Sequence, residues 1–164
     1  MTITNRRFKN SDAEDVADLV AKTMLTSNTN DYPKSFLEKN LRNLTPDVFI
    51  KRAKEFHCYV FVDDTVNKIV AVGSIGPYWG SKEESSLFNI FVDPEYQGQG
   101  IGRKIIEVLE RDSYFIRAKR IEIPASKTGL NFYLHMGYDY KNGANNLDET
   151  GYYRLEKFNN KNDL

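Results

Sequence analysis

The stretch LFNIFVDPEYQGQGIGRKIIEVLE, residues 87–110, changes character twice along its length. Its first part, Leu87–Val92, is a short apolar run of the kind that forms a buried strand. Asp93-Pro94 ends this run, and three glycines follow within six residues, QGQGIG at 97–102. From Ile101 to Leu109, apolar residues recur at helical spacing. The stretch therefore predicts a strand, a glycine-rich turn and a helix in succession.

The glycine-rich turn is a candidate anion site. The first backbone amides of a helix have no partner within the helix, and the helix dipole adds partial positive charge there. Clustered glycines let a ligand approach these amides, so the pattern predicts a phosphate group, with Arg103 and Lys104 adding positive charge. The spacing G-x-G-x-G is not the dinucleotide fingerprint G-x-G-x-x-G, and the Gly-Lys-Ser/Thr of a P-loop is absent. On spacing alone, a tight turn without a ligand is the alternative.

Hydrophobic periodicity and turn residues place the remaining elements. Strands are predicted at 2–8, 58–62, 68–75, 120–123, 138–141 and 152–156, and helices at 12–26, 101–111 and 130–136, with two further helices beginning at Pro33 and Pro46. We expect Pro124 to close the strand before it. The order predicts an α/β (α+β) fold in which helices cover a central sheet. The chain is expected to form a single domain over residues 1–158, followed by a C-terminal tail at 159–164.

Composition excludes several classes of protein. Lys and Arg number 23, and Asp and Glu number 23, so the chain has no overall attraction for nucleic acid or an anionic membrane. The single cysteine, Cys58, allows no internal disulfide and no cysteine metal cluster, and we expect it to be buried. His57, His135 and Cys58 have no ligand-like spacing, so no metal is expected. The N-terminus does not match a signal peptide and no run of about 18 apolar residues occurs, which predicts a soluble, cytoplasmic protein.

Two segments resemble those of a known family. In residues 87–110, Val92-Asp93-Pro94 follows an apolar strand, and Gln97-Gly98-Gln99-Gly100-Ile101-Gly102 opens a helix. In SKTGLNFYLHMGYDY, residues 126–140, the pair Phe132-Tyr133 precedes Gly137-Tyr138. Both resemble the signature segments of the GNAT family of acyl-CoA N-acyltransferases, and especially the ribosomal-protein alanine N-acetyltransferases. The resemblance extends to the element order and implies a GNAT-type fold, with a central mixed sheet of about seven strands flanked by helices.

The resemblance implies acetyl-CoA as the cosubstrate, and it implies which residues bind it. In the family, the main chain of the strand before the glycine turn bonds the pantetheine arm, and Ile90, Phe91 and Val92 match that strand. The pyrophosphate loop is matched by Gln97, Gly98, Gln99, Gly100, Ile101, Gly102 and Arg103. Many relatives have an asparagine at the position of Ser126, so we expect Ser126 or Asn131 to make its contact.

The resemblance also implies the catalytic residues. Tyr133 falls on the family's tyrosine, which protonates the departing CoA thiolate, and a phenol can donate a proton without being charged beforehand. The alternative for Tyr133 is a half-buried packing residue, and Phe132 and Tyr138 are assigned to the core. In the relatives that look most similar, a glutamate on the strand after the glycine helix is the general base, which points to Glu122 when a one-residue gap is allowed.

Alternatives to Glu122 as the base remain open. Glu122 can instead be a solvated carboxylate at a strand end, flanked by Arg120. Glu83 and Glu84 are rival bases, and a relay through water is a further route. A base matters because a lysine-type amine, with a pKa of about 10.4, is neutral in only about one molecule in 10³ at pH 7.

The function expected from the resemblance is N-acetyltransfer, in which a primary amine attacks acetyl-CoA directly, with no covalent enzyme intermediate and no metal. Two alternatives are a CoA-binding sensor or interaction module without turnover, and a peptide-binding module that uses the sheet edge. The acceptor is expected to be a small-molecule or peptide amine, with no nucleic acid and no membrane as partner. Tyr78 and Trp79, in a turn-rich loop, either pack into the core or cover this acceptor, and whether the chain forms a homodimer is left open.

Overall fold

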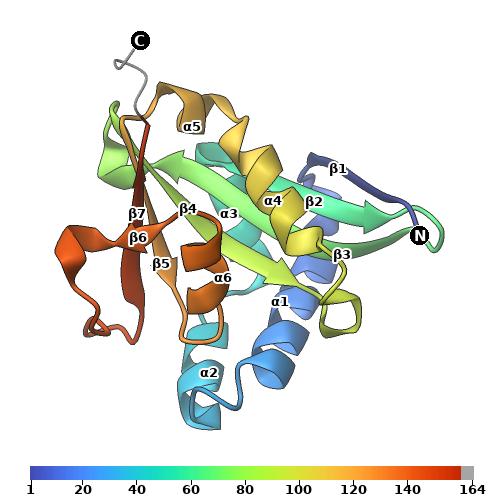
Figure 1. The fold of residues 1–164 in the computed structure, drawn as a ribbon. Helices are drawn as coiled ribbons and strands as arrows, with labels where there is room; N and C mark the ends of the chain where they lie inside the picture. Colours follow the sequence, from blue (N-terminus) through green and yellow to red (C-terminus); the bar gives the residue numbers. More distant parts are fainter. Residues whose placement is uncertain (160–164) are drawn as a thin grey trace. The chain divides into compact units, whose positions relative to one another are not determined.

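The computed structural model describes residues 1–159 of the 164-residue chain. Figure 1 shows the chain as a ribbon coloured along the sequence. The chain divides into two compact units. Unit 1 consists of Met1–Ser74 and Asn89–Ile105, and unit 2 consists of Ile75–Phe88 and the residues from Ile106 onward. The single domain expected over residues 1–158 stays a prediction. Apart from Asn159, the expected tail at 159–164 lies outside the described residues.

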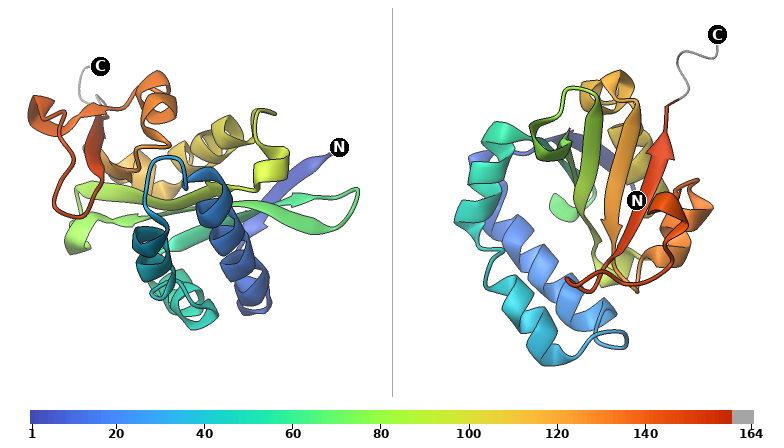
Figure 2. Two further views of the ribbon diagram at one scale, coloured as in Figure 1. Left: turned by 90° about the horizontal axis from the view of Figure 1, so that it is seen from below. Right: turned by 90° about the vertical axis from the view of Figure 1, so that its left-hand side faces the viewer.

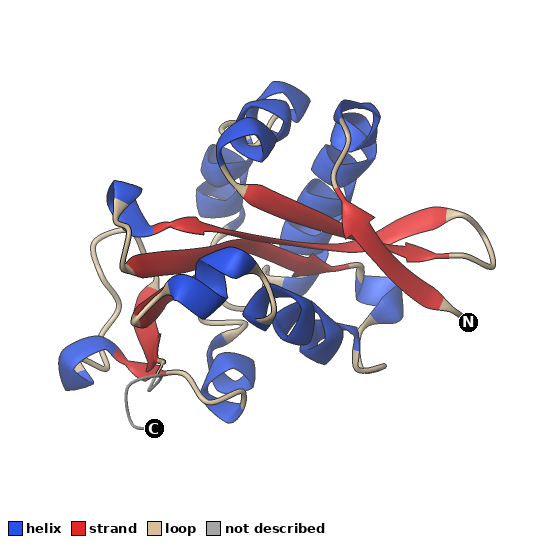
Figure 3. Ribbon diagram, turned by 90° about the horizontal axis from the view of Figure 1, so that it is seen from above, coloured by secondary structure: helices blue, strands red, loops and turns tan. Residues whose placement is uncertain are grey.

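Within residues 1–159, seven strands form one mixed sheet; Figure 3 shows the strands in red. They are β1 (Ile3–Arg7), β2 (His57–Asp63), β3 (Lys68–Pro77), β4 (Glu84–Val92), β5 (Arg120–Ala125), β6 (Asp139–Tyr140) and β7 (Tyr153–Phe158). Their order is β1-β2-β3-β4-β5-β7-β6. The pair β4/β5 is parallel, whereas β1/β2, β5/β7 and β6/β7 are antiparallel. The predicted mixed sheet of about seven strands is confirmed.

Unit 1 contains three helices that pack on its strands (Figure 2). They are α1 (Ala13–Ser27), α2 (Lys34–Leu41) and α3 (Pro46–Glu55). Apolar residues at helical spacing on α1 join residues of the other helices and of β2 and β3 in one buried cluster, which includes Val16, Leu19, Val20, Met24, Leu37, Phe49, Val60, Val62 and Val72. The periodicity that predicted α1 is thus the face that the helix buries. Pro46 is the first residue of α3, as predicted, and Pro33 lies one residue before α2.

Unit 2 contains α5 (Ser113–Arg117), α6 (Leu130–His135) and the second half of α4 (Ile101–Glu110). Two expectations are corrected here. Residues 113–117 form a helix that periodicity missed, capped by Asp112, whose side chain accepts a hydrogen bond from the Tyr114 amide at 2.8 Å. Strand β5 does not end before Pro124, because Pro124 pairs with Arg154 of β7 and the strand continues to Ala125.

The segment that leaves β4 is held firmly within unit 1 by Asp93. This carboxylate is 1% exposed. It lies 3.0 Å from the Lys22 ammonium and 3.3 Å from that of Lys68, and it accepts a hydrogen bond from the Glu95 amide at 2.9 Å. The Asp93 amide donates to the carbonyl of Val70 at 2.8 Å. The start of the glycine-rich turn therefore has a fixed position in its own unit.

We expect Asp93→Ala to lower the free energy of unfolding by about 1–3 kcal/mol at pH 7, because it removes hydrogen bonds to a charged group. Burial raises the pKa of Asp93, but the hydrogen bonds from Glu95, Lys22 and Lys68 outweigh it and lower the pKa overall. A carboxylate with a lowered pKa stabilises the fold above the unfolded-state value of about 3.9 and loses this effect in acid. Urea unfolding of both proteins should therefore show a difference that shrinks below about pH 4.

The matched control is Glu95→Gln, because Glu95 pairs with the same two lysines but its side chain is 69% exposed. A pair this exposed should change stability by no more than about 1 kcal/mol. Equal effects of the two substitutions would show that Asp93 does not anchor this segment.

Candidate acetyl-CoA and acceptor sites

Two glycines give the turn before α4 its shape. Gly98 and Gly100 have φ angles of +78° and +81°, in the left-handed region that favours glycine. A Cβ atom added at either position would meet no atom within 4 Å, so the space beside this backbone is open. The amides that begin α4 therefore lie where a phosphate can reach them, and exposed Arg103 and Lys104 follow on the first turn. These residues fit the phosphate group that the glycine pattern predicts here, and the pyrophosphate that the family resemblance implies.

Gln97 has a definite role in holding this turn. Its side-chain amide donates to the Ser27 hydroxyl at 3.0 Å and to the carbonyl of Val92 at 3.1 Å. Gln97 thus ties the turn to the end of α1 and to the end of β4, all within unit 1. Its direct contact with a cofactor stays a prediction, as does that of the neighbouring exposed Gln99.

Strand β4 changes its backbone conformation at Asn89, which has a φ angle of +52° inside the strand. A left-handed residue departs from the extended backbone of a strand, so the regular conformation of β4 is interrupted immediately before Ile90. The ladder that joins β4 to β5 consists of Glu84–Ser86 with Arg120–Glu122. Along β4, the backbone of Ile90, Phe91 and Val92 therefore follows both this interruption and that ladder, which fits the predicted role of these residues in binding an extended chain.

Tyr133 is the buried residue of α6, with 8% of its surface exposed. Its ring packs edge-on to that of Phe132, with the ring centres 5.2 Å apart. Burial raises the pKa of the Tyr133 phenol above its usual value, so the group stays protonated at neutral pH. The proton that the predicted acid must give is thus present, and the predicted catalytic role stays a prediction. Tyr138 is buried, as expected, and Phe132 is half-buried.

The turn before α6 fits closely around Tyr133. The Ser126 hydroxyl oxygen accepts a hydrogen bond from the Gly129 amide at 3.0 Å, and the Gly129 carbonyl accepts one from the Tyr133 amide at 3.2 Å. Ser126 therefore shapes the turn, whereas Asn131 lies exposed on α6. A Cβ atom added at Gly129 would lie 2.9 Å from the ring carbon Cε2 of Tyr133. Glycine at 129 is thus what allows this ring position.

Gly129→Ala should displace the Tyr133 ring or the turn, because no real Cβ contact is that short. Overpacking of this kind typically costs about 1–3 kcal/mol, which urea unfolding would measure. A crystal structure of the variant should show the ring moved. A variant with wild-type stability and an unmoved ring would contradict the fit described here.

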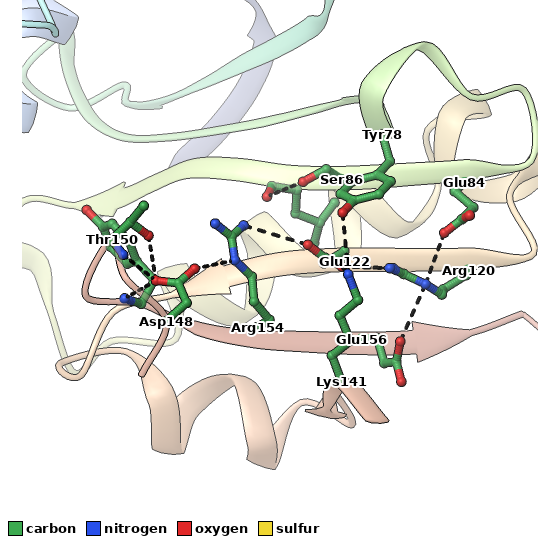
Figure 4. Close-up of polar contacts among 12 residues, drawn as sticks. Tyr78, Glu84, Ser86, Arg120, Glu122, Lys141, Asp148, Thr150, Arg154 and Glu156 are labelled. Carbon is green, nitrogen blue, oxygen red and sulfur yellow. Dashed lines mark hydrogen bonds and ion pairs between the residues drawn. The ribbon is translucent and has the colours of Figure 1, made fainter. Parts of the chain in front are cut away.

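Glu122 lies at the centre of a network of charges in unit 2 (Figure 4). Its side chain is 1% exposed. One carboxylate oxygen lies 2.6 Å from an Arg120 nitrogen and 2.8 Å from the Lys141 ammonium, and the other lies 3.6 Å from Arg154. The solvated strand-end alternative is therefore wrong. That Glu122 is the general base stays a prediction, although these three cations account for the burial of its charge without any substrate.

The same face of the sheet carries further charged residues. Arg120 also contacts Glu84 at 3.0 Å and Glu156 at 3.4 Å, so it separates the carboxylates of neighbouring strands. Arg120 and Lys141 lie over the ring of Tyr78, at 5.2 and 5.4 Å from its centre. Tyr78 is thus covered by cations rather than inserted in an apolar core.

The rival bases are paired as well. Glu83 lies 3.2 Å from Lys119, in a pair whose side chains are both more than 60% exposed, and Glu84 contacts Arg120. Trp79 is 89% exposed and has a φ angle of 48°, a strained conformation for a bulky residue. The packing interpretation of Trp79 is therefore wrong, and its contact with an acceptor stays a prediction.

Three further observations on the described residues concern reactive cysteine, metal binding and membrane-spanning helices. Cys58 is buried, as expected, and burial raises the pKa of its thiol, which disfavours the reactive thiolate. Within residues 1–159, no three His, Cys, Asp or Glu side chains are grouped so that they could hold a metal ion. Over the same residues, no helix has the length and apolar character needed to cross a membrane.

Sequence comparison matches residues 54–140 to the family described as acetyltransferase (GNAT) domain. The chain is 33% identical over 55 residues to GCN5-related N-acetyltransferase 2, a chloroplastic protein of Arabidopsis thaliana. That match covers 34% of this chain and 21% of the relative, so the chain spans about one fifth of the relative's length.

Solved structures show the same fold. The PaiA N-acetyltransferase of Thermoplasma acidophilum, in complex with coenzyme A, has a TM-score of 0.82 at 13% identity, over 97% of this chain and 100% of that chain. A GCN5-related N-acetyltransferase of Rhodopseudomonas palustris has a TM-score of 0.76 at 17% identity, over 96% of both chains. Glucosamine-6-phosphate N-acetyltransferase of Arabidopsis thaliana has a TM-score of 0.62 at 18% identity, over 91% of this chain and 98% of that chain.

Proposed function

Because the chain belongs to the GNAT acetyltransferase family, we propose that it transfers the acetyl group of acetyl-CoA directly to a primary amine. One observation carries this proposal: two left-handed glycines leave open space beside the backbone at the start of α4. This is where the resemblance to the family places the pyrophosphate of coenzyme A, and a structural neighbour was solved with coenzyme A bound. Family membership favours this activity over a CoA-binding module without turnover.

The proposed reaction has simple chemistry. The neutral amine nitrogen attacks the thioester carbonyl carbon, the carbon–sulfur bond breaks, and the coenzyme leaves as a thiolate. The new amide nitrogen loses a proton to a water molecule, and the thiolate gains one. Tyr133, kept protonated by burial, donates a hydrogen bond or its proton to the sulfur. The amides at the start of α4 hold the pyrophosphate and so fix the thioester in position.

The acceptor is proposed to be an amine of a small molecule or a peptide. The balance of 23 basic and 23 acidic residues supports this, because an acceptor drawn in by long-range attraction would need an excess of one charge. Direct transfer also needs an amine that has lost its proton. Glu122 was expected to remove it, but its oxygens already face three cations. The proposed reaction therefore does not depend on Glu122 as the base.

Gly100→Val should weaken acetyl-CoA binding at least about tenfold, because the side chain occupies the space that the pyrophosphate needs. Isothermal titration calorimetry on the folded variant would measure this. The matched control is Gly143→Val, since Gly143 also has a positive φ, of +71°, and no atom within 4 Å of an added Cβ. It imposes similar backbone strain outside the turn. Equal affinities for acetyl-CoA in the two variants would remove the main support for the proposed function.

Tyr133→Phe keeps the ring and removes the proton, so turnover should slow by about 10²–10⁴-fold with little change in acetyl-CoA affinity. Thiol release from acetyl-CoA with a panel of amines is the assay. Tyr138→Phe is the control, because Tyr138 is also buried in unit 2 and its hydroxyl donates to Glu110 at 3.0 Å. Similar slowing in both variants, or none in Tyr133→Phe, would assign Tyr133 to packing.

A further inference from the structure

The network around Glu122 leaves two cations within reach of solvent. The side chains of Lys141 and Arg154 are 30% and 38% exposed, whereas those of Glu122 and Arg120 are 1% and 13% exposed. The Glu122 carboxylate is thus buried, whereas the two cations that contact it are partly exposed to solvent. A buried anion under partly exposed cations holds those cations in place.

Arg154 is held in a definite orientation. Its Nε atom donates to Asp148 at 2.6 Å, and its Nη1 atom lies 3.6 Å from Glu122. Asp148 is itself fixed, since it accepts hydrogen bonds from the Thr150 hydroxyl at 2.6 Å and from the Thr150 and Tyr152 amides. Partial burial raises the pKa of Asp148, but these bonds and the one from Arg154 outweigh it and lower the pKa to about 2. Asp148 is therefore a carboxylate at physiological pH.

Arg154 contacts two carboxylates of the network, those of Asp148 and Glu122. Glu84 and Glu156 contact Arg120, which lies on the other side of Glu122 in Figure 4. Arg154 pairs with Pro124, further along β5 and closer to the turn that begins α6. At this end of the network, cationic N–H groups outnumber the oxygens that they contact. Arg154 carries five N–H donors and Lys141 three, and each uses only part of this set on the contacts above.

We propose that Lys141 and Arg154 bind a carboxylate of the acceptor, so that the acceptor is an amine that also carries a carboxylate, such as an amino acid or a peptide. The inference rests on the proposed function and adds the acceptor's chemical class. A guanidinium presents parallel donors that match a carboxylate, and an ammonium adds a point charge beside it. Because both cations are held before the acceptor arrives, little ordering entropy is lost on binding.

In this arrangement Glu122 is a positioning residue. Its carboxylate oxygens lie 2.8 Å from the Lys141 ammonium and 3.6 Å from the Arg154 guanidinium, and they hold both cations in place without touching the acceptor. The effect of substituting Glu122 distinguishes this positioning role from general-base catalysis. Removing a base slows the reaction of every amine, whereas releasing the two cations weakens the binding of acceptors that carry a carboxylate.

The first experiment measures binding without turnover. The probes are the N-acetyl derivatives of glycine, β-alanine and γ-aminobutyrate, each compared with its carboxamide, in NMR titrations of the protein in the presence of coenzyme A. At least one acid should bind at least about tenfold more tightly than its amide. Arg154→Gln and Lys141→Gln should each abolish most of that preference. Lys119→Gln, which alters an exposed pair in the same unit, should leave it unchanged.

Two outcomes overturn the proposal: no acid preferred over its amide, or a preference that survives Arg154→Gln. Calorimetry with coenzyme A alone separates these outcomes from a failure of the proposed function. If the protein binds coenzyme A but either overturning outcome is observed, only the carboxylate site is contradicted. If the wild-type protein does not bind coenzyme A, the proposed acetyltransferase function itself is contradicted.

The second experiment tests Glu122 with Glu122→Gln and a pair of acceptors, an amino acid and its carboxamide. We expect the KM for the amino acid to rise at least about tenfold, whereas its kcat should change little. For the carboxamide, both kcat and KM should change little. If turnover instead slows by about a hundredfold or more for both acceptors, and the acid limb of the pH–rate profile is lost, Glu122 is the base and its positioning role is refuted.

Discussion

The geometry of the turn between β4 and α4 depends on backbone angles that only glycine adopts at low cost. Gly98 and Gly100 are both left-handed, and this conformation turns the chain so that α4 begins with its amides unobstructed. The anchors on either side serve the same turn. Asp93, held by two lysines, fixes its beginning, and buried Ile101 fixes the first residue of the helix. An anion site of this kind consists of backbone amides. Glycine is needed where a side chain would block these amides, and the other side chains, such as Asp93 and Ile101, hold the two ends of the turn in place.

A second constraint is the pairing of β5. Its ladder with β4 ends at Ser86 and Glu122, although its ladder with β7 continues to Ala125. Beyond Glu122 the strand is therefore an edge on its β4 side, which explains how Pro124, with no N–H to donate, fits inside it. Together with the left-handed Asn89 in β4, this proline marks where regular pairing stops. The family expectation that the pantetheine arm bonds to strand backbone is consistent with both features.

The sequence predicted the seven strands, the main helices and the glycine turn because these depend on local periodicity and turn residues. Helix α5 was missed because its five residues are too few to show a hydrophobic periodicity, although Asp112 at its start is a recognisable N-cap. The environment of Glu122 could not be predicted from its neighbours, since Lys141 and Arg154 come from other elements. One signal was available: the pattern Arg-x-Glu occurs in both β5, at Arg120 and Glu122, and β7, at Arg154 and Glu156. Period-2 spacing places each pair on one face of its strand.

That shared face has an energetic consequence. Glu122 lies directly opposite Glu156 in the β5–β7 register, which by itself is destabilising. Arg120 contacts both carboxylates and relieves this repulsion. Burying such a network costs desolvation energy that its ion pairs barely recover, and apolar side chains of similar volume are often equally stable. The network therefore contributes geometry more than stability: each buried carboxylate fixes the direction of a cation, and the outermost cations, Lys141 and Arg154, face solvent with their positions already set.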